Sequence, residues 1–146
     1  MHPNRRLADA LMSDSKFDFA LGPLESEVME AAWKLGGGWV TIANVLEERE
    51  RSGGSKLAYS TIKAVVSNLH DKGHLRKRSE GKQNGFKPVL SREKFAARAI
   101  GRVLAPLLRD HRNPLLAHIV DELIDDEEGL AQLQALLAAK KRPHAR

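Results

Sequence analysis

The side chains best suited to chemistry lie along one segment, residues 59–72. One side of this segment is aliphatic at helical spacing, with Ile62, Val65, Val66 and Leu69. The other side carries short polar groups and one long cation, Lys63. Short side chains let a helix approach base edges, hydroxyl groups bond to several of those edges, and a lysine reaches O6 and N7 of guanine. The pattern predicts a helix that reads the major groove of DNA through Tyr59, Ser60, Thr61, Lys63, Ala64, Ser67 and Asn68.

The first residues of this helix, Tyr59 and Ser60, are also candidates for phosphate binding or for structural roles. Its first-turn amides, at Tyr59 and Ser60, suit a phosphate, because a helix N-terminus attracts anions. Tyr59 fits the edge of the core equally well, and Ser60 is a candidate N-cap.

A basic stretch follows, in which lysines and arginines between residues 72 and 98 outnumber Glu80 and Glu93. Extended segments at residues 74–79 and 86–90 flank a polar turn, where Asn84-Gly85 is a strong hairpin signal. Pro88 predicts that the second strand lies at an edge. The net charge of +5 agrees with a polyanionic partner. We expect a hairpin that contacts phosphates through Arg76, Lys77, Arg78, Lys82 and Lys87.

Two shorter helices precede the segment at residues 59–72. Gly22-Pro23 begins the first, and the glycines at 36–38 end it. Trp39-Val40 forms a short extended pair, and Thr41 caps the second helix. We expect Trp33 and Trp39 in the core. The order of helix, short strand, two helices and hairpin is that of a winged helix-turn-helix.

The remainder of the chain is predicted to be helical. Ser91 caps a long helix that runs to about residue 110, and Pro106 should kink or break it. Asn113-Pro114 predicts the start of the next helix, and Asp125 or Asp126 the start of the last. These helices carry more leucines than a monomer buries, so we expect a homodimer. The predicted dimer contacts are Leu107, Leu115, Leu116, Ile119, Leu130, Leu133, Leu136 and Leu137.

The expected fold class is therefore mainly α with a small β wing, a winged helix-turn-helix followed by a C-terminal helical dimerisation domain. We divide the chain into a flexible N-terminal arm (residues 1–20), a DNA-binding domain (21–91), a dimerisation domain (92–140) and a basic tail (141–146).

Several function classes are excluded or disfavoured by what the sequence lacks. It has no cysteine, which excludes disulfides and thiolate metal sites. No apolar run spans a bilayer and the N-terminus lacks a signal core, so we expect a cytoplasmic protein with no membrane contact. His111, His118 and His144 show no metal-binding spacing, and no nucleophile motif is present. We expect no enzyme, no cofactor and no metal.

Three stretches resemble the penicillinase-repressor family (BlaI/MecI/CopY type) of winged-helix repressors. They are residues 21–29 with Trp33, residues 58–69 ending at Lys72-Gly73, and residues 114–122. The resemblance implies a dimeric repressor on palindromic operators, in an antibiotic (β-lactam) or stress response, with Thr61 and Lys63 at DNA-facing positions. Asn68 departs from the family pattern, where an arginine is usual, and so does Phe86-Lys87-Pro88, where paired aromatics are usual.

The resemblance leaves the inducing signal open. Some members of the family are released by a regulatory protease, but no cleavage site can be matched here, and the Cys-x-Cys motif of copper-responsive members is absent. Two other functions also stay open. One is a winged-helix module that binds another protein, and the other is a one-component sensor that binds a small molecule or metal between its domains.

Overall fold

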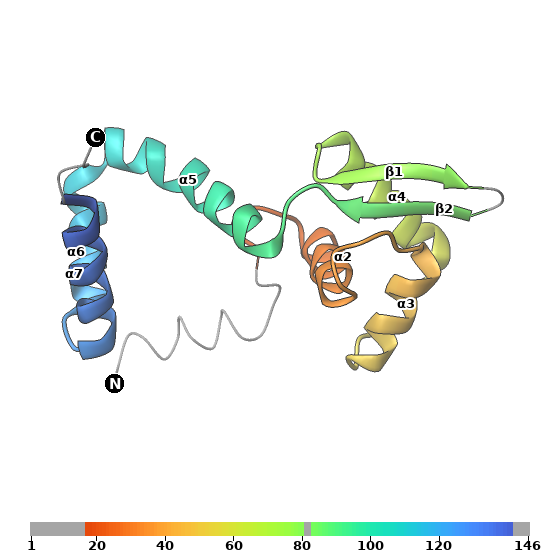
Figure 1. The fold of residues 1–146 in the computed structure, drawn as a ribbon, viewed down its shortest axis with the longest axis horizontal. Helices are drawn as coiled ribbons and strands as arrows, with labels where there is room; N and C mark the ends of the chain where they lie inside the picture. The colour runs from red at the N-terminus through yellow and green to blue at the C-terminus, as the bar shows by residue number, and fades with distance from the viewer. Residues whose placement is uncertain (1–16, 81–82, 142–146) are drawn as a thin grey trace. The chain divides into compact units, whose positions relative to one another are not determined.

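The structure, a computed structural model, describes residues 17–80 and 83–141. Three helices come first: α2 (Pro23–Lys34), α3 (Ile42–Arg51) and α4 (Tyr59–Asp71). A hairpin of β1 (Leu75–Glu80) and β2 (Gln83–Pro88) follows, and then α5 (Arg92–Asp110), α6 (Arg112–Leu123) and α7 (Glu127–Lys141) (Figure 1). The predicted class, mainly α with a small β wing in a winged helix-turn-helix, is confirmed.

The chain divides into two compact units, and the division falls after Gly101, inside α5. The first unit holds the hydrophobic core, in which α4 packs on α2, on α3 and on β1. The buried residues of α4 are the four predicted ones, Ile62, Val65, Val66 and Leu69. The proposed functional boundaries at residues 21, 92 and 141 stay a prediction.

Most helix ends follow the predicted local chemistry. The Thr41 hydroxyl accepts from the Asn44 amide at 3.2 Å, and the Asn44 side chain accepts from the Thr41 amide at 2.9 Å. Ser91 caps α5, and Asp126 accepts from the Gly129 amide at 2.8 Å at the start of α7. Gly73 has φ +84°, the left-handed conformation that ends α4.

Two predictions about helix ends are wrong. Ala58, not Ser60, is the N-cap of α4, because Ser60 already lies in the helix. His111, not Asn113, is the N-cap of α6, so Pro114 is the third helical residue. This position is still in the first turn, whose amides have no intrahelical partner. Helix α5 continues through Pro106, so the proline does not break it, and the alternative of a kink there stays a prediction.

The end of the predicted flexible arm belongs to the core. Phe17 is only 2% exposed and Leu21 is buried. The Phe17 amide donates to Ser26 Oγ at 3.2 Å, and its ring lies 5.4 Å from Trp33 and 5.2 Å from Phe95, centroid to centroid. The prediction of an arm is therefore wrong for residues 17–20, while residues 1–16 lie outside the described part.

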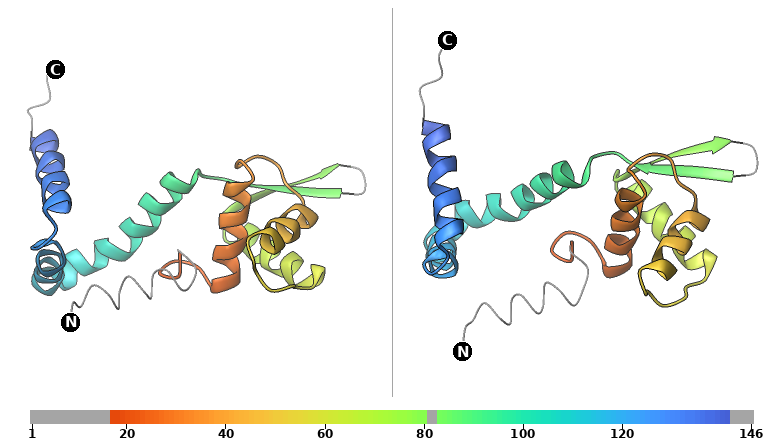
Figure 2. Two further views of the ribbon diagram at one scale, coloured as in Figure 1. Left: turned by 90° about the horizontal axis from the view of Figure 1, so that it is seen from below. Right: turned by 60° about the horizontal axis from the view of Figure 1, so that its bottom comes forward.

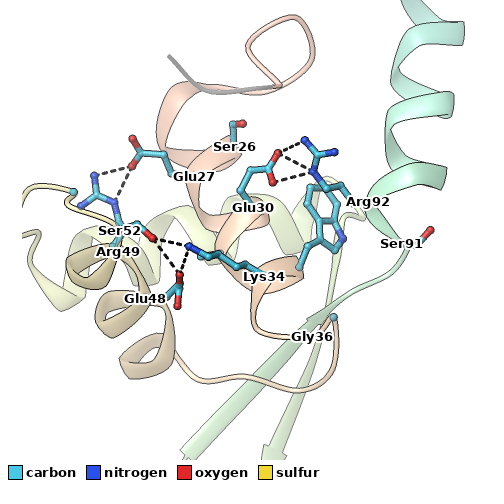
Figure 3. A pocket seen from close by; sticks show the side chains of 14 residues that line it. Ser26, Glu27, Glu30, Lys34, Gly36, Glu48, Arg49, Ser52, Ser91 and Arg92 are labelled. Atoms are coloured by element: carbon cyan, nitrogen blue, oxygen red, sulfur yellow. Dashed lines mark hydrogen bonds and ion pairs between the residues drawn. The ribbon is translucent and has the colours of Figure 1, made fainter. Parts of the chain in front are cut away.

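The first turns of α5 are attached to α2. Trp33 Nε1 donates to the Leu90 carbonyl at 3.0 Å, and this tryptophan, predicted in the core, is half-buried and packs against the edge of the core. Arg92 forms a bidentate pair with Glu30, with a shortest distance of 2.9 Å (Figure 3). Phe95 is buried. The start of α5 is thus part of the winged-helix core.

The hairpin projects from the helices of the first unit, as Figure 2 shows in two further views. Its register pairs Ser79 with Asn84 and Arg78 with Gly85, so Asn84 and Gly85 lie in β2 and the predicted turn at Asn84-Gly85 is wrong. As predicted, β2 is an edge strand of the two-stranded sheet; on its other side Phe86 forms an isolated bridge and exchanges two backbone hydrogen bonds of 2.8 Å with Val40. Pro88 is tolerated as the last residue of the strand, beyond that bridge.

Glu48 of α3 is an almost buried carboxylate, 4% exposed, that ties α3 to α2. Lys34 lies 2.8 Å away, Ser52 donates at 3.1 Å, and Arg51 lies at 3.4 Å. The hydrogen bond from Lys34 is the main cause that lowers the pKa of Glu48; burial acts in the opposite direction, and Ser52 and Arg51 assist Lys34.

We predict an acid sensitivity that depends on Glu48. A carboxylate whose pKa is lowered on folding stabilises the protein above its unfolded pKa, and this stability is lost as the pH falls through the folded pKa. Between neutral pH and about pH 3, urea unfolding of Glu48→Gln should therefore lose less stability than that of the wild type. Glu47→Gln, at the exposed neighbouring position, is the control and should behave as the wild type. If the wild type and Glu48→Gln lost equal stability on acidification, Glu48 would not be the cause of the acid sensitivity.

A second prediction concerns Phe17. Removing a buried phenylalanine leaves a cavity, so Phe17→Ala should lower the free energy of unfolding by about 3 kcal/mol in a urea titration. Phe19→Ala is the matched control, because Phe19 is 48% exposed. It should cost less than about 1 kcal/mol. Equal losses would show that Phe17 is not part of the core in solution.

Candidate nucleic-acid interface

The outward face of α4 is built by the burial of its aliphatic face. Lys63, Ala64 and Asn68 are exposed, and Thr61 and Ser67 are half-buried at the sides. Lys63 forms no hydrogen bond or ion pair with the described residues. The helix therefore presents a narrow polar surface with one long cation at its centre, which suits contact with base edges.

The N-terminus of α4 has no side-chain cap. The N-cap residue, Ala58, has no side-chain acceptor, and Tyr59 and Ser60 occupy the first turn. Tyr59 is 57% exposed, so it is a surface residue and not part of the core edge. An open N-terminus of this kind attracts anions such as a phosphate group.

The loop before α4 is held by Arg49 of α3. Its guanidinium lies 2.7 Å from Glu27 of α2 and also donates to the carbonyl of Ser55 (Figure 3 shows the pair with Glu27). The Gly54 amide donates to the Arg49 carbonyl at 2.9 Å. These contacts fix the path of the loop between α3 and α4, and so the position at which α4 begins.

One face of the wing continues the surface of α4. Lys77 of β1 donates to Ser67 Oγ at 3.4 Å, so the cation lies beside the polar face of the helix. Its cross-strand partner Phe86 is buried in the core. The predicted residues Lys77 and Ser67 are therefore brought together, although they belong to different elements.

The other face of the wing carries Arg76, Arg78 and Lys87, since side chains alternate along a strand. Trp39 lies on this face, with the Arg78 guanidinium 4.5 Å and the Lys87 ammonium 5.3 Å from its ring. Trp39 is half-buried and is not a core residue, which corrects its prediction. Trp39 precedes Val40 in an extended segment, and Val40 pairs with Phe86. Because side chains alternate along such a segment, Trp39 lies on the outer face when Val40 is buried. Lys82 lies outside the described residues.

Part of the basic stretch is structural. Lys72 pairs with Glu25 at 2.8 Å, and Arg92 pairs with Glu30. Burial would raise the pKa of Glu25, but the hydrogen bonds from Lys72 and from the Gly22 amide, together with the charges of Lys72 and His74, outweigh it and lower that pKa. Lys72 and Arg92 are thus paired with carboxylates of α2. The candidate interface is therefore the α4 surface together with the wing.

A groove of about 840 Å³ lies within the first unit, along α2, α3 and the start of α5 (Figure 3). Its charged residues pair with one another, as Glu27 with Arg49, Glu30 with Arg92 and Lys34 with Glu48. Within residues 17–80 and 83–141, no three His, Asp or Glu side chains gather as a metal site. None of the described helices has the length and apolar character needed to cross a bilayer.

The chain was compared with protein families, curated proteins and solved structures. A search of curated proteins finds no match. The archaeal chromatin protein TrmBL2, described as showing a novel mode of DNA binding, is 23% identical with a TM-score of 0.41. That likeness covers 85% of this chain and 46% of TrmBL2, so this chain spans about half the length of that protein. The transcriptional regulator BldR from Sulfolobus solfataricus is 17% identical with a TM-score of 0.40, over 96% of this chain and 93% of BldR.

The family model described as penicillinase repressor matches residues 21–139, which include the three stretches that resemble this family. The chain therefore belongs to the penicillinase repressor family, a family of DNA-binding transcriptional repressors.

Proposed function

We propose that this protein is a sequence-specific repressor that binds a palindromic operator as a homodimer. Helix α4 enters the major groove, where Lys63 contacts a base edge and Thr61, Ala64 and Ser67 allow close approach. The wing contacts the neighbouring phosphates. The observation that carries the proposal is the outward face of α4, with Lys63 exposed and Lys77 of the wing held beside it by Ser67.

The second unit supports the homodimer. No residue of α6 or α7 is buried, and the buried residues of α5 are Phe95 and Ala99, both in the first unit. Of the predicted contact residues, Leu116, Leu133, Leu136 and Leu137 are exposed, and Leu107, Leu115, Ile119 and Leu130 are half-buried. Val120 and Ile124 add to this apolar surface and were not among the predicted contacts. Helices this apolar and this exposed need a partner, and a second copy supplies a self-complementary one.

Repression follows from occupancy of the promoter by the dimer. The family match supports a role in an antibiotic (β-lactam) or stress response. A module that binds another protein would lack salt-dependent duplex affinity. A sensor would show a melting shift on adding its ligand.

The base-reading role of Lys63 predicts a loss of specificity. Lys63→Ala should cost about 1–3 kcal/mol on the operator and much less on random duplex, measured by fluorescence anisotropy. Arg78→Ala, on the wing, should weaken both duplexes alike and flatten the salt dependence. An equal loss on operator and random DNA for Lys63→Ala would remove its assigned role.

The dimer role of α7 predicts dissociation on charge insertion. Leu136 is 63% exposed in the protomer, so Leu136→Glu should fold normally and weaken the dimer at least about tenfold, since a buried unpaired charge is costly. Sedimentation equilibrium measures the change. Val89→Glu, at an exposed apolar position of the first unit, is the control and should leave the association unchanged. A Leu136→Glu protein that associates as tightly as the wild type would contradict the proposed interface.

A further inference from the structure

Arg78 and Lys87 of the wing share one aromatic ring. They sit on different strands, yet both cationic groups lie over Trp39, at 4.5 Å and 5.3 Å from the ring centroid. A cation is attracted to the face of an indole ring, so both the Arg78 and the Lys87 side chains are held at the Trp39 ring. Such a pair is a ready site for adjacent phosphates.

The backbone places this ring with little freedom. The two hydrogen bonds between Val40 and Phe86 fix the short extended segment beside β2. Because Val40 is buried beneath the sheet, Trp39 lies on the outer face. Trp39 is half-buried there, with Arg78 and Lys87 at its ring.

Gly85 lies next to the contact between Trp39 and Arg78. It lies opposite Arg78 in the hairpin register. A Cβ atom added at Gly85 would be 3.6 Å from the Trp39 ring and 3.5 Å from Arg78 Nε. At these distances an added Cβ atom would be in ordinary van der Waals contact with both groups, so Gly85 lies directly beside the point where Trp39 and Arg78 meet.

We propose that Trp39 is a positioning residue for DNA binding, which holds Arg78 and Lys87 as a preformed phosphate-binding pair on the outer face of the wing. This inference rests on the proposed function. Its surface is separate from Lys77, which faces α4 on the opposite side of the hairpin. The pair binds phosphates without regard to sequence, so Trp39 contributes to affinity on every duplex and not to specificity.

The test uses the full chain and a fluorescein-labelled random-sequence duplex, titrated at several salt concentrations. Trp39→Leu should weaken binding about fivefold and lower the slope of log affinity against log salt by about one. Trp39→Phe, which keeps an aromatic face, should fall between the two proteins. Melting temperatures of all variants are compared, so that loss of folding is recognised.

The Arg78→Gln/Lys87→Gln protein separates positioning from direct contact. In that background Trp39→Leu should have no further effect on affinity. A similar loss in both backgrounds, or wild-type binding by Trp39→Leu, would overturn the inference and leave the proposed function standing. Failure of the wild type to bind any duplex would overturn both.

A second measurement needs no variant. The Arg78 side-chain protons of the wild type should show an upfield ring-current shift in the NMR spectrum, because the guanidinium lies over the indole. Random-coil shifts for these protons would overturn the stacking on which the inference depends.

Discussion

Burial of the aliphatic face of α4 is the constraint on which the other features depend. Ile62 and Leu69 are fully enclosed by α2, α3 and β1, and Val65 and Val66 complete the same face. A buried aliphatic side chain contributes about 1.5–3 kcal/mol, so rotating this helix about its axis would be very costly. The direction of Lys63 is therefore set by the core, and the position of the wing follows because Leu75 and Phe86 close that core from the other side.

Charges in this protein fall into two groups with different roles. Glu25, Glu30 and Glu48 are matched by Lys72, Arg92 and Lys34, and these pairs attach α4, α5 and α3 to α2. Lys63, Arg76, Lys77 and Lys87 form no ion pair with an acidic side chain among residues 17–80 and 83–141. The separation gives a neutralised scaffold and a positive outer surface, which is the arrangement that phosphate binding requires.

The two units differ in how much of their apolar surface they bury. The first encloses its own core, with Phe17 and Phe95 joining the aromatic residues around Trp33. The second leaves its leucines open, so its apolar surface makes sense only with a partner.

By itself the sequence determined the helices, their order and the outward face of α4, because these depend on local periodicity and on caps such as Thr41 and Gly73. It also indicated the family through short motifs. Only the tertiary structure decided the hairpin register, the burial of Phe17 and the position of Trp39. Each of these depends on a contact distant in sequence, such as Val40 with Phe86 or Phe17 with Phe95, which no local pattern contains. A one-residue change of register would move every side chain of a strand to its other face, so the wing's two cationic faces could be assigned only from the pairing itself.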